Sequence, residues 1–272
     1  MVLQAAPEDL FREGRLRDAI AAQTALVRAA PSDVNLRWLL AELLCFVEQW
    51  ERADQLLDVV ASQVPDRATA VLRFRGLLRG EQTRRQVMQE GRAPKIMGSS
   101  APILQLVVAA LLFLREGQPD EAAPKIEEAA QTSPAAGIRD GGQSFDVFRD
   151  IDDVCAPFVE FITEGGEYHW VPTGDITLLE TRPLSRPRDL IWRPARLEVR
   201  DGPQGEVFLP AIYVSSDAGS DDEARLGRRT EWREPQGSLV RGVGLRTFLV
   251  GDDDVPIHEL GRLEFQNNMR KP

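Results

Sequence analysis

A helical pattern that recurs at a nearly fixed interval constrains this chain more than any other feature. In residues 35–65, apolar side chains recur at three- and four-residue steps in two segments, and the turn Glu48-Gln49 separates them. Such spacing predicts two helices that fold back on each other. Ala53 is small enough to let the two helices approach closely, and Pro65 ends the second helix.

The same pattern lies upstream and downstream of this hairpin. A 34-residue helix–turn–helix period is typical of tetratricopeptide repeats, and one such hairpin cannot bury its own apolar face. We therefore expect an N-terminal tetratricopeptide-like α-α superhelix. One intervening unit is degenerate, since Arg84 and Val87 stand where Trp50 and Ala53 would recur. Thirty-four residues before Trp50, Ala53 and Pro65 stand Leu16, Ala19 and Pro31. Sixty-nine residues after them stand Pro119, Ala122 and Pro134, and Ala41 is matched by Ala110 at the same distance.

The composition and periodicity of the sequence change after this helical half. Residues 135–144 are rich in glycine and predict a domain boundary, with a helical repeat domain at 1–137 and a second domain at 138–272. One more helix is expected at 151–164, capped by Asp150. Short β-rich runs without long helices between them predict a mainly antiparallel sheet or a partly open barrel, which makes the fold class α+β. These runs are 168–171, 176–181, 190–192, 195–200, 206–214, 228–233, 244–250 and 257–265.

Charge and hydropathy exclude several classes of function. The net charge of −10 argues against a nucleic-acid partner and against docking on an anionic membrane, because both need clustered positive charge. The first residues lack the basic and apolar segments of a secretory signal, and the longest apolar run, 103–114, is too short to span a bilayer. Cys45 and Cys155 each lie in an expected apolar helical face, where a thiol packs as a small hydrophobe. We expect a cytoplasmic protein with reduced cysteines.

Residues suited to catalysis or metal binding are few. His169 alternates with Tyr168 and Trp170 in an expected strand, so a structural or surface role is the simpler interpretation. The sequence has no nucleophile elbow, no phosphate-binding loop and no cysteine/histidine metal spacing. We therefore expect no catalytic residue, cofactor or metal. Two acidic loops, one with Asp217, Asp221 and Asp222 and one at 252–254, are interpreted as solvated turns rather than calcium sites.

The helical repeats offer the better surface for a protein partner. In tetratricopeptide stacks the first helix of each hairpin lines a concave groove, where a partner helix docks its apolar side. The repeat register places Trp38, Glu42 and Cys45 in this groove, and Val107, Leu111 and Leu114 in the corresponding face of the later hairpin. For Leu111 and Leu114 an equally good interpretation is that they are core residues packed on the β domain.

A second candidate surface is the segment Arg228-Arg229-Thr230-Glu231-Trp232. In a strand, Arg229 and Trp232 would lie on opposite faces. Their combination is typical of an interface hot spot. We prefer a structural interpretation, in which Trp232 fills the small β core and an arginine pairs with an acidic neighbour at the domain junction.

Four short segments carry a resemblance to a known family. Residues 50–53 (WERA), 168–172 (YHWVP), 189–192 (DLIW) and 228–232 (RRTEW) resemble the ImpE/TagJ family of type VI secretion accessory proteins. The resemblance implies a non-enzymatic cytoplasmic role in which the protein binds the N-terminal helix of the small sheath subunit, TssB. It further implies action around the contractile sheath and its disassembly by the ATPase ClpV. Two alternatives stay open: a generic tetratricopeptide scaffold for another partner, and an enzyme with its site between the two domains. The oligomeric state is left open.

Overall fold

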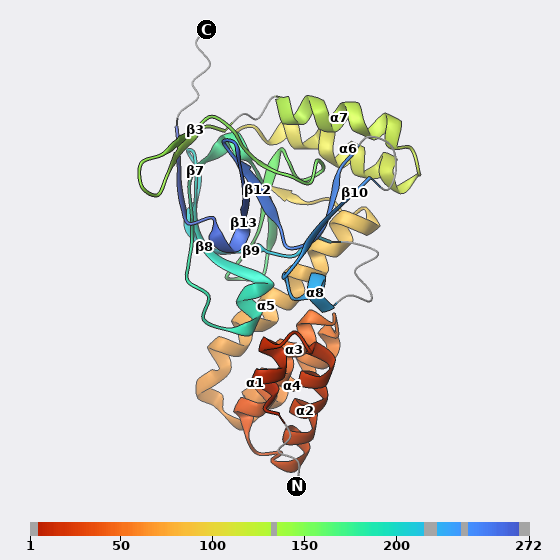
Figure 1. Cartoon of the computed structure of the whole chain (residues 1–272), viewed down its shortest axis with the longest axis vertical. Helices are drawn as coiled ribbons and strands as arrows, with labels where there is room; N and C mark the ends of the chain where they lie inside the picture. The colour runs from red at the N-terminus through yellow and green to blue at the C-terminus, as the bar shows by residue number, and fades with distance from the viewer. Residues whose placement is uncertain (1–4, 132–134, 215–221, 235–238, 267–272) are drawn as a thin grey trace.

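The computed structural model describes residues 5–131, 135–214, 222–234 and 239–266. The first four helices form one end of an elongated molecule, and the strands form the other end together with a separate helical hairpin (Figure 1). One long helix connects the two ends. The expected α+β architecture, with tetratricopeptide-like helices followed by a mainly antiparallel β domain, is confirmed.

Two stacked hairpins make the N-terminal end, α1 (Pro7–Arg12) with α2 (Leu16–Ala29) and α3 (Val34–Phe46) with α4 (Trp50–Gln63). The carboxylate of Asp33 caps α3 by accepting hydrogen bonds from the backbone N–H groups of Asn35 at 2.8 Å and Leu36 at 3.4 Å. The small residues of the repeat, Ala19 and Ala53, are fully buried where the helices cross.

The third unit departs from the repeat at the place where the sequence does. After a 3-10 turn (Pro65–Arg67), α5 (Ala68–Arg85) runs straight through Arg84, the position at which α2 and α4 begin in the other units. A π-helical turn (Gln86–Glu90) follows and ends at Gly91, whose φ is 86°. The second helix of this unit is therefore replaced by an extension of α5 into the β domain.

The last hairpin, α6 (Leu104–Arg115) with α7 (Pro119–Gln131), packs beside the sheet rather than on α3 and α4 (Figure 1). Its second helix begins at Pro119, 69 residues after the start of α4, and Ala110 and Ala122 are fully buried, so the repeat register is confirmed. Pro134 lies outside the described residues. The side chains of Leu104 and Val107 share a core with Trp170, which places this apolar helix against the β domain.

A nine-stranded sheet organises the β half. Only β1 pairs in parallel, with β6, and the other pairs are antiparallel. Because β1 precedes α6, both halves of the chain contribute to this sheet. Its order is β1 (Lys95–Ile96), β6 (Tyr168–Pro172), β5 (Phe158–Thr163), β9 (Gln204–Pro210), β8 (Trp192–Val199), β7 (Ile176–Thr181), β14 (Arg262–Phe265), β2 (Gly137–Arg139), β3 (Ser144–Phe145).

Two smaller sheets and five short helical segments complete the domain. One sheet has the order β13 (Asp253–Pro256), β12 (Thr247–Val250), β4 (Phe148–Asp150), and the other pairs β10 (Thr230–Arg233) with β11 (Arg241–Gly244). The segments are η3 (Ala101–Ile103), η4 (Thr173–Asp175), η5 (Pro187–Leu190), α8 (Asp222–Arg225) and η6 (Ile257–Glu259).

The helix expected at 151–164 is wrong. Residues 151–157 form turns, and β5 follows at Phe158–Thr163. This strand lies inside the sheet and is buried on both faces, so its apolar residues do not alternate and their spacing resembles that of a helix. Asp150 caps no helix, and Cys155 lies in a buried turn. The strands expected at 168–171 and 176–181 are confirmed. The strand expected at 190–192 is wrong, because Leu190 ends η5, Ile191 lies in a turn and β8 begins only at Trp192.

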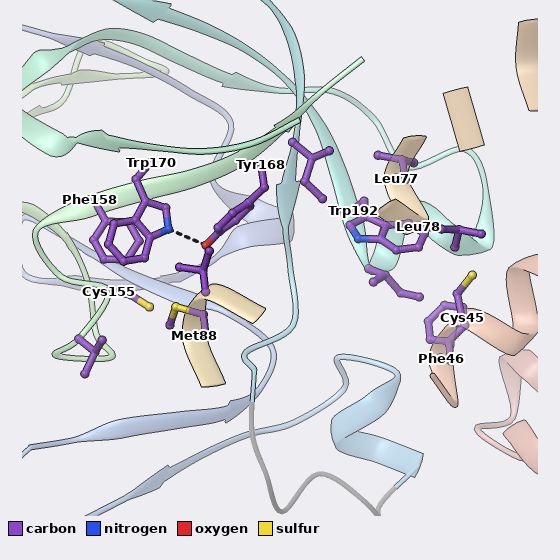
Figure 2. Close-up of a cluster of buried hydrophobic side chains, with 14 of the residues drawn as sticks. Cys45, Phe46, Leu77, Leu78, Met88, Cys155, Phe158, Tyr168, Trp170 and Trp192 are labelled. Atoms are coloured by element: carbon purple, nitrogen blue, oxygen red, sulfur yellow. Dashed lines mark hydrogen bonds between the residues drawn. The ribbon is translucent and has the colours of Figure 1, made fainter. Parts of the chain in front are cut away.

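The core of the molecule crosses the junction between its halves. Trp192 of β8 lies between Leu77 and Leu78 of α5 and the end of α3 (Figure 2). Farther along the same core, the rings of Phe158 and Trp170 stack with their centroids 4.1 Å apart. A second core on the opposite face of the sheet contains the neighbouring strand residues Val159 and Val171, as strand alternation requires. The helices and the sheet thus form one continuous packed unit.

Candidate functional site

A pocket of about 380 Å³ opens along α3 on the concave side of the helical hairpins. The start of α5 and the segment before η5 close its other walls, so both halves of the chain contribute to it. Its lining combines apolar surface with two arginines. The residues are Asn35, Trp38, Leu39 and Glu42 from α3, Arg67 from the 3-10 turn before α5, Ala70 from α5, and Arg186 from the β domain.

Trp38 and Glu42 are held in place by an arginine of the β domain. The Trp38 indole N–H donates a hydrogen bond of 2.9 Å to Glu42 Oε1. Arg188 Nε lies 3.7 Å from the same oxygen, and its guanidinium sits over the rings of Phe74 and Trp38 at 4.4 and 5.4 Å. Asp189 fixes the position of this segment by accepting hydrogen bonds from the backbone N–H groups of residues 185 and 186. The concave face of α3 is therefore partly occupied by the chain's own β domain.

The charges of Glu42 and Arg188 compensate each other only in part. Burial raises the pKa of the Glu42 carboxyl, and the nearby Arg188 guanidinium offsets part of this rise. Burial likewise lowers the pKa of Arg188, and Glu42 opposes this effect. Arg188 Nη1 is buried and has no hydrogen-bond acceptor among the described residues. A buried guanidinium group with one unsatisfied N–H donor thus lies directly behind the Trp38 and Glu42 wall of the pocket.

The structure separates the candidate residues of the helical half. Trp38 and Glu42 line the pocket, as a groove position requires. Cys45 is buried behind them, so the expectation that it faces an open groove is wrong. The same correction applies to Val107, which is buried in the shared core. For Leu111 and Leu114 the structure agrees with the alternative interpretation as core residues, since Leu111 is buried in this core and Leu114 is half-buried against it. Their hairpin packs on the sheet, and this contact buries the face of α6 that would line an open groove.

The arginine-rich segment forms β10 on the two-stranded sheet. The preferred interpretation that Trp232 fills the β core is wrong, because its side chain is 40% exposed, and it meets the Tyr213 ring in an edge-to-face arrangement with the centroids 6.0 Å apart. Arg229 pairs with Glu231 at 2.9 Å. Arg228 makes the junction contact instead, and its Nη2 donates to the carbonyl oxygens of Phe11 at 3.0 Å and Arg12 at 2.7 Å. Neither Arg229 nor Trp232 lines the pocket on α3.

A buried ionic network joins α5 to the sheet. Glu160 of β5 accepts two hydrogen bonds from Arg84, and Arg246 also donates to it. Arg84 pairs with Glu81 at 3.1 Å, and the Trp192 indole donates to Glu81 at 3.1 Å. On the far side, Arg246 Nη1 lies 3.3 Å from Asp150 Oδ2. Tyr168 donates to Glu160, and the Trp170 indole donates to the Tyr168 hydroxyl, as the dashed line in Figure 2 shows.

The pKa shifts in this network follow its charges. Burial opposes ionisation of Glu160, but Arg246 and Arg84 more than offset it and lower the pKa of Glu160 to about 2. Asp150 has the opposite balance, because burial outweighs Arg246 and raises its pKa to about 7. With its arginines already paired to carboxylates, the network is suited to holding the two halves together.

Among the described residues, the two histidines and the acidic loop at 252–254 are not arranged as a metal site. His169 is buried and stacks on Phe161, with its ring on the face opposite to Tyr168 and Trp170. No cluster of three metal-ligating side chains occurs within the described residues, and Asp217 and Asp221 lie outside them. In the part of the chain that the structure describes, no helix has the length and apolar character needed to cross a membrane.

Comparisons with known proteins agree with this architecture. Residues 142–264 match the family model described as ImpE protein, and residues 10–78 match a tetratricopeptide repeat model. A relative from Pseudomonas aeruginosa, the type VI secretion system accessory component TagJ, is 34% identical over 261 residues, which cover 95% of this chain and 90% of the relative. This chain belongs to the ImpE/TagJ family.

A solved structure has the same fold as this ImpE/TagJ family member. An X-ray structure of a protein from Vibrio parahaemolyticus is 26% identical and covers 97% of this chain and 98% of its own, with a TM-score of 0.88. The two chains therefore share the whole arrangement of helical hairpins and sheets.

Sequence reasoning missed several arginines of this family member on which the pocket and the junction depend, Arg188 among them. Arg67 and Arg186 line the pocket, and Arg84 anchors the junction. Arg84 had a signal, because it breaks the repeat at the position of Trp50. Arg186 had none, since it is 119 residues beyond Arg67 and only tertiary folding brings the two to one pocket.

Proposed function

We propose that this protein is a non-catalytic adaptor of a type VI secretion system. In this proposal it binds the N-terminal helix of the small sheath subunit, TssB, and modulates sheath assembly or ClpV-driven disassembly in the cytoplasm. Family membership supports the assignment to a type VI secretion system. The proposed mode of binding is supported by the open pocket beside the half-buried Trp38. An amphipathic helix places one or two apolar side chains into such a groove.

The pocket supports a modest affinity. It is small compared with a full protein interface, and a mobile helix loses ordering entropy when it docks. We therefore expect a dissociation constant on the order of micromolar. A generic scaffold for another partner would use the same surface. The adaptor and scaffold hypotheses are distinguished by whether the pocket binds the TssB helix or a helix of another protein. The enzyme alternative has less support, since the charged groups at the domain junction are paired with one another.

The test is calorimetric titration of the full chain with a synthetic TssB N-terminal helix. Ala70→Gln places a longer, helix-compatible side chain into the pocket and is expected to weaken binding at least tenfold. Leu72→Gln, on the same helix, is the matched control because Leu72 is 63% exposed and does not line the pocket. Equal affinity for wild type and Ala70→Gln would remove the pocket from the mechanism, and no binding to wild type would refute the adaptor proposal itself.

A further inference from the structure

The pocket on α3 carries local positive charge in a strongly acidic protein. The chain has a net charge of −10, yet the ionisable groups that line the pocket are Arg67, Arg186 and a single carboxylate, Glu42. Glu42 is already engaged, because it accepts a hydrogen bond from Trp38 and faces Arg188 at 3.7 Å. Arg67 and Arg186 therefore retain charge that the pocket itself does not neutralise.

The geometry of these arginines suits recognition rather than packing. Arg67 Nη2 donates to Asn35 Oδ1 at 2.8 Å, which orients the guanidinium on one wall. Arg186 stands on another wall, at the start of a segment that Asp189 fixes through two backbone hydrogen bonds of 2.9 and 3.0 Å. A guanidinium binds a carboxylate through charge-assisted hydrogen bonds with defined geometry. Behind the wall, the positive charge of Arg188 is offset by Glu42, so the net positive charge of the pocket comes from Arg67 and Arg186.

Apolar surface lies between the charged walls. Trp38, Leu39 and Ala70 form the part of the lining that a hydrocarbon side chain contacts. A ligand that satisfies the whole pocket must therefore present an apolar group and a carboxylate side by side. A volume of about 380 Å³ accommodates one or two such side chains and excludes a globular surface. Adjacent apolar and acidic residues along one face of a helix have this chemistry.

We infer that the pocket recognises an acidic amphipathic helical segment of a protein partner, with Arg67 and Arg186 binding a carboxylate of that segment. This inference rests on the proposed adaptor function and names the chemistry that selects its partner. The apolar contacts supply part of the affinity, whereas the two arginines discriminate in favour of an acidic residue beside the apolar anchor. A neutral helix with the same apolar residues binds more weakly, because the arginines then lose hydration without gaining a partner.

Two synthetic peptides of about 14 residues test the inference. Both carry leucines at positions i, i+3, i+4 and i+7, and they differ only in having glutamate or glutamine beside these leucines. Calorimetry gives the affinities for the full chain, and the ¹⁵N-labelled indole resonance of Trp38 reports occupancy of the pocket. We expect the glutamate peptide to bind about tenfold more tightly at low salt, and this advantage to shrink at 0.5 M NaCl.

Variants assign the preference to the two arginines. Arg67→Gln with Arg186→Gln is expected to abolish the preference for glutamate while the protein keeps its thermal stability, since neither residue belongs to the core. Arg79→Gln, an exposed arginine on α5 outside the pocket lining, is the matched control and should retain the preference. Equal affinities of the two peptides for wild type, or a preference that survives the double substitution, would overturn the inference.

The same variants separate this inference from the proposed function. If the TssB helix binds wild type and the Arg67/Arg186 double variant equally, the adaptor function stands and the role of the arginines is refuted. If the TssB helix does not bind but the peptide preference behaves as described, the pocket chemistry stands and the sheath assignment fails.

Discussion

Arg84 of α5 and Glu160 of β5 form an ion pair with two hydrogen bonds, Nε to Oε2 at 2.9 Å and Nη2 to Oε1 at 2.8 Å. Both side chains are buried, and 76 residues of sequence separate them. The pair lies where the third repeat unit fails to turn back, so the residue that ends the repeat is the residue that attaches it to the sheet. The side chains of Arg246, Glu81 and Tyr168 and the carbonyl oxygen of Ile212 also contact one member of the pair or the other.

Substitution of Glu160 by glutamine is expected to destabilise the protein strongly. Glu160→Gln leaves Arg84 and Arg246 buried with no carboxylate between them, and breaking such a buried pair costs about 3 kcal/mol. Urea denaturation followed by fluorescence measures the loss. Glu167→Gln breaks the exposed pair with Lys95 and is the control, for which no measurable change is expected. Similar midpoints for the two variants would show that the buried pair contributes little.

Gly80 sets the distance between α5 and β5. A Cβ atom added there would lie 2.5 Å from Ile162 Cγ2, so Gly80→Ala forces the helix and strand apart. Despite the better helix propensity of alanine, we expect a net loss of about 1–2 kcal/mol in the free energy of unfolding. Ile162→Ala removes the colliding atoms, so the double variant should cost less than the sum of the two single substitutions. Additive effects in this double-mutant cycle would contradict the close approach, and Gly205→Ala, with open space around it, is the control.

His258 makes the stability depend on pH in a mildly acidic window. Burial and then the nearby Arg193 lower the pKa of His258 from 6.5 to about 4, and both ring nitrogens lack hydrogen-bond partners among the described residues. Between these two pKa values the unfolded chain binds a proton that the folded chain does not. His258 by itself therefore lowers the free energy of unfolding as the pH decreases from about 6.5 to about 4. Asp150 acts in the opposite direction, because burial raises its pKa to about 7 and the folded chain then binds a proton that the unfolded chain does not.

His258→Leu should reduce this slope, measured as the melting temperature at half-unit steps of pH. The variant keeps two other contributions, that of His169, whose pKa burial also lowers, and the opposing one of Asp150, so the slope of the variant is compared with that of wild type. An unchanged slope in His258→Leu would mean that His258 is already accessible to protons in the folded state.

Arg228 ties the first helix to the β domain. It donates hydrogen bonds to the carbonyl oxygens of Phe11 and Arg12 in the last turn of α1. Arg228→Gln removes a contact worth about 1 kcal/mol, so amide hydrogen exchange in α1 should accelerate about fivefold. Exchange in β5 and β6 is expected to stay at the wild-type rate, because this opening is local. Faster exchange throughout the molecule would instead assign Arg228 to global stability.

Much of the helical half was predictable because its pattern is local. The starts of α2, α4 and α7 at Leu16, Trp50 and Pro119 follow from a spacing readable along the chain, and helix periodicity depends on residues three or four apart. The helix expected in place of β5 shows the limit of this reasoning. A strand buried on both faces loses the alternation that distinguishes it, and only its pairing with β6 and β9 determines that it is a strand.

The candidate site was predictable only in part, for the same reason. Helical spacing in the sequence was enough to place Trp38 and Glu42 on one face of α3. It did not show that Arg186 and Arg188 of the β domain lie against that face. Nor did it show that Val107 and Leu111 are buried where their helix packs on the sheet. Repeats, helix registers and overall fold class were thus determined by the sequence itself, because they arise from contacts between near neighbours. The pocket and its charge were decided by tertiary structure, because they depend on segments more than a hundred residues apart that only the folded sheet brings together.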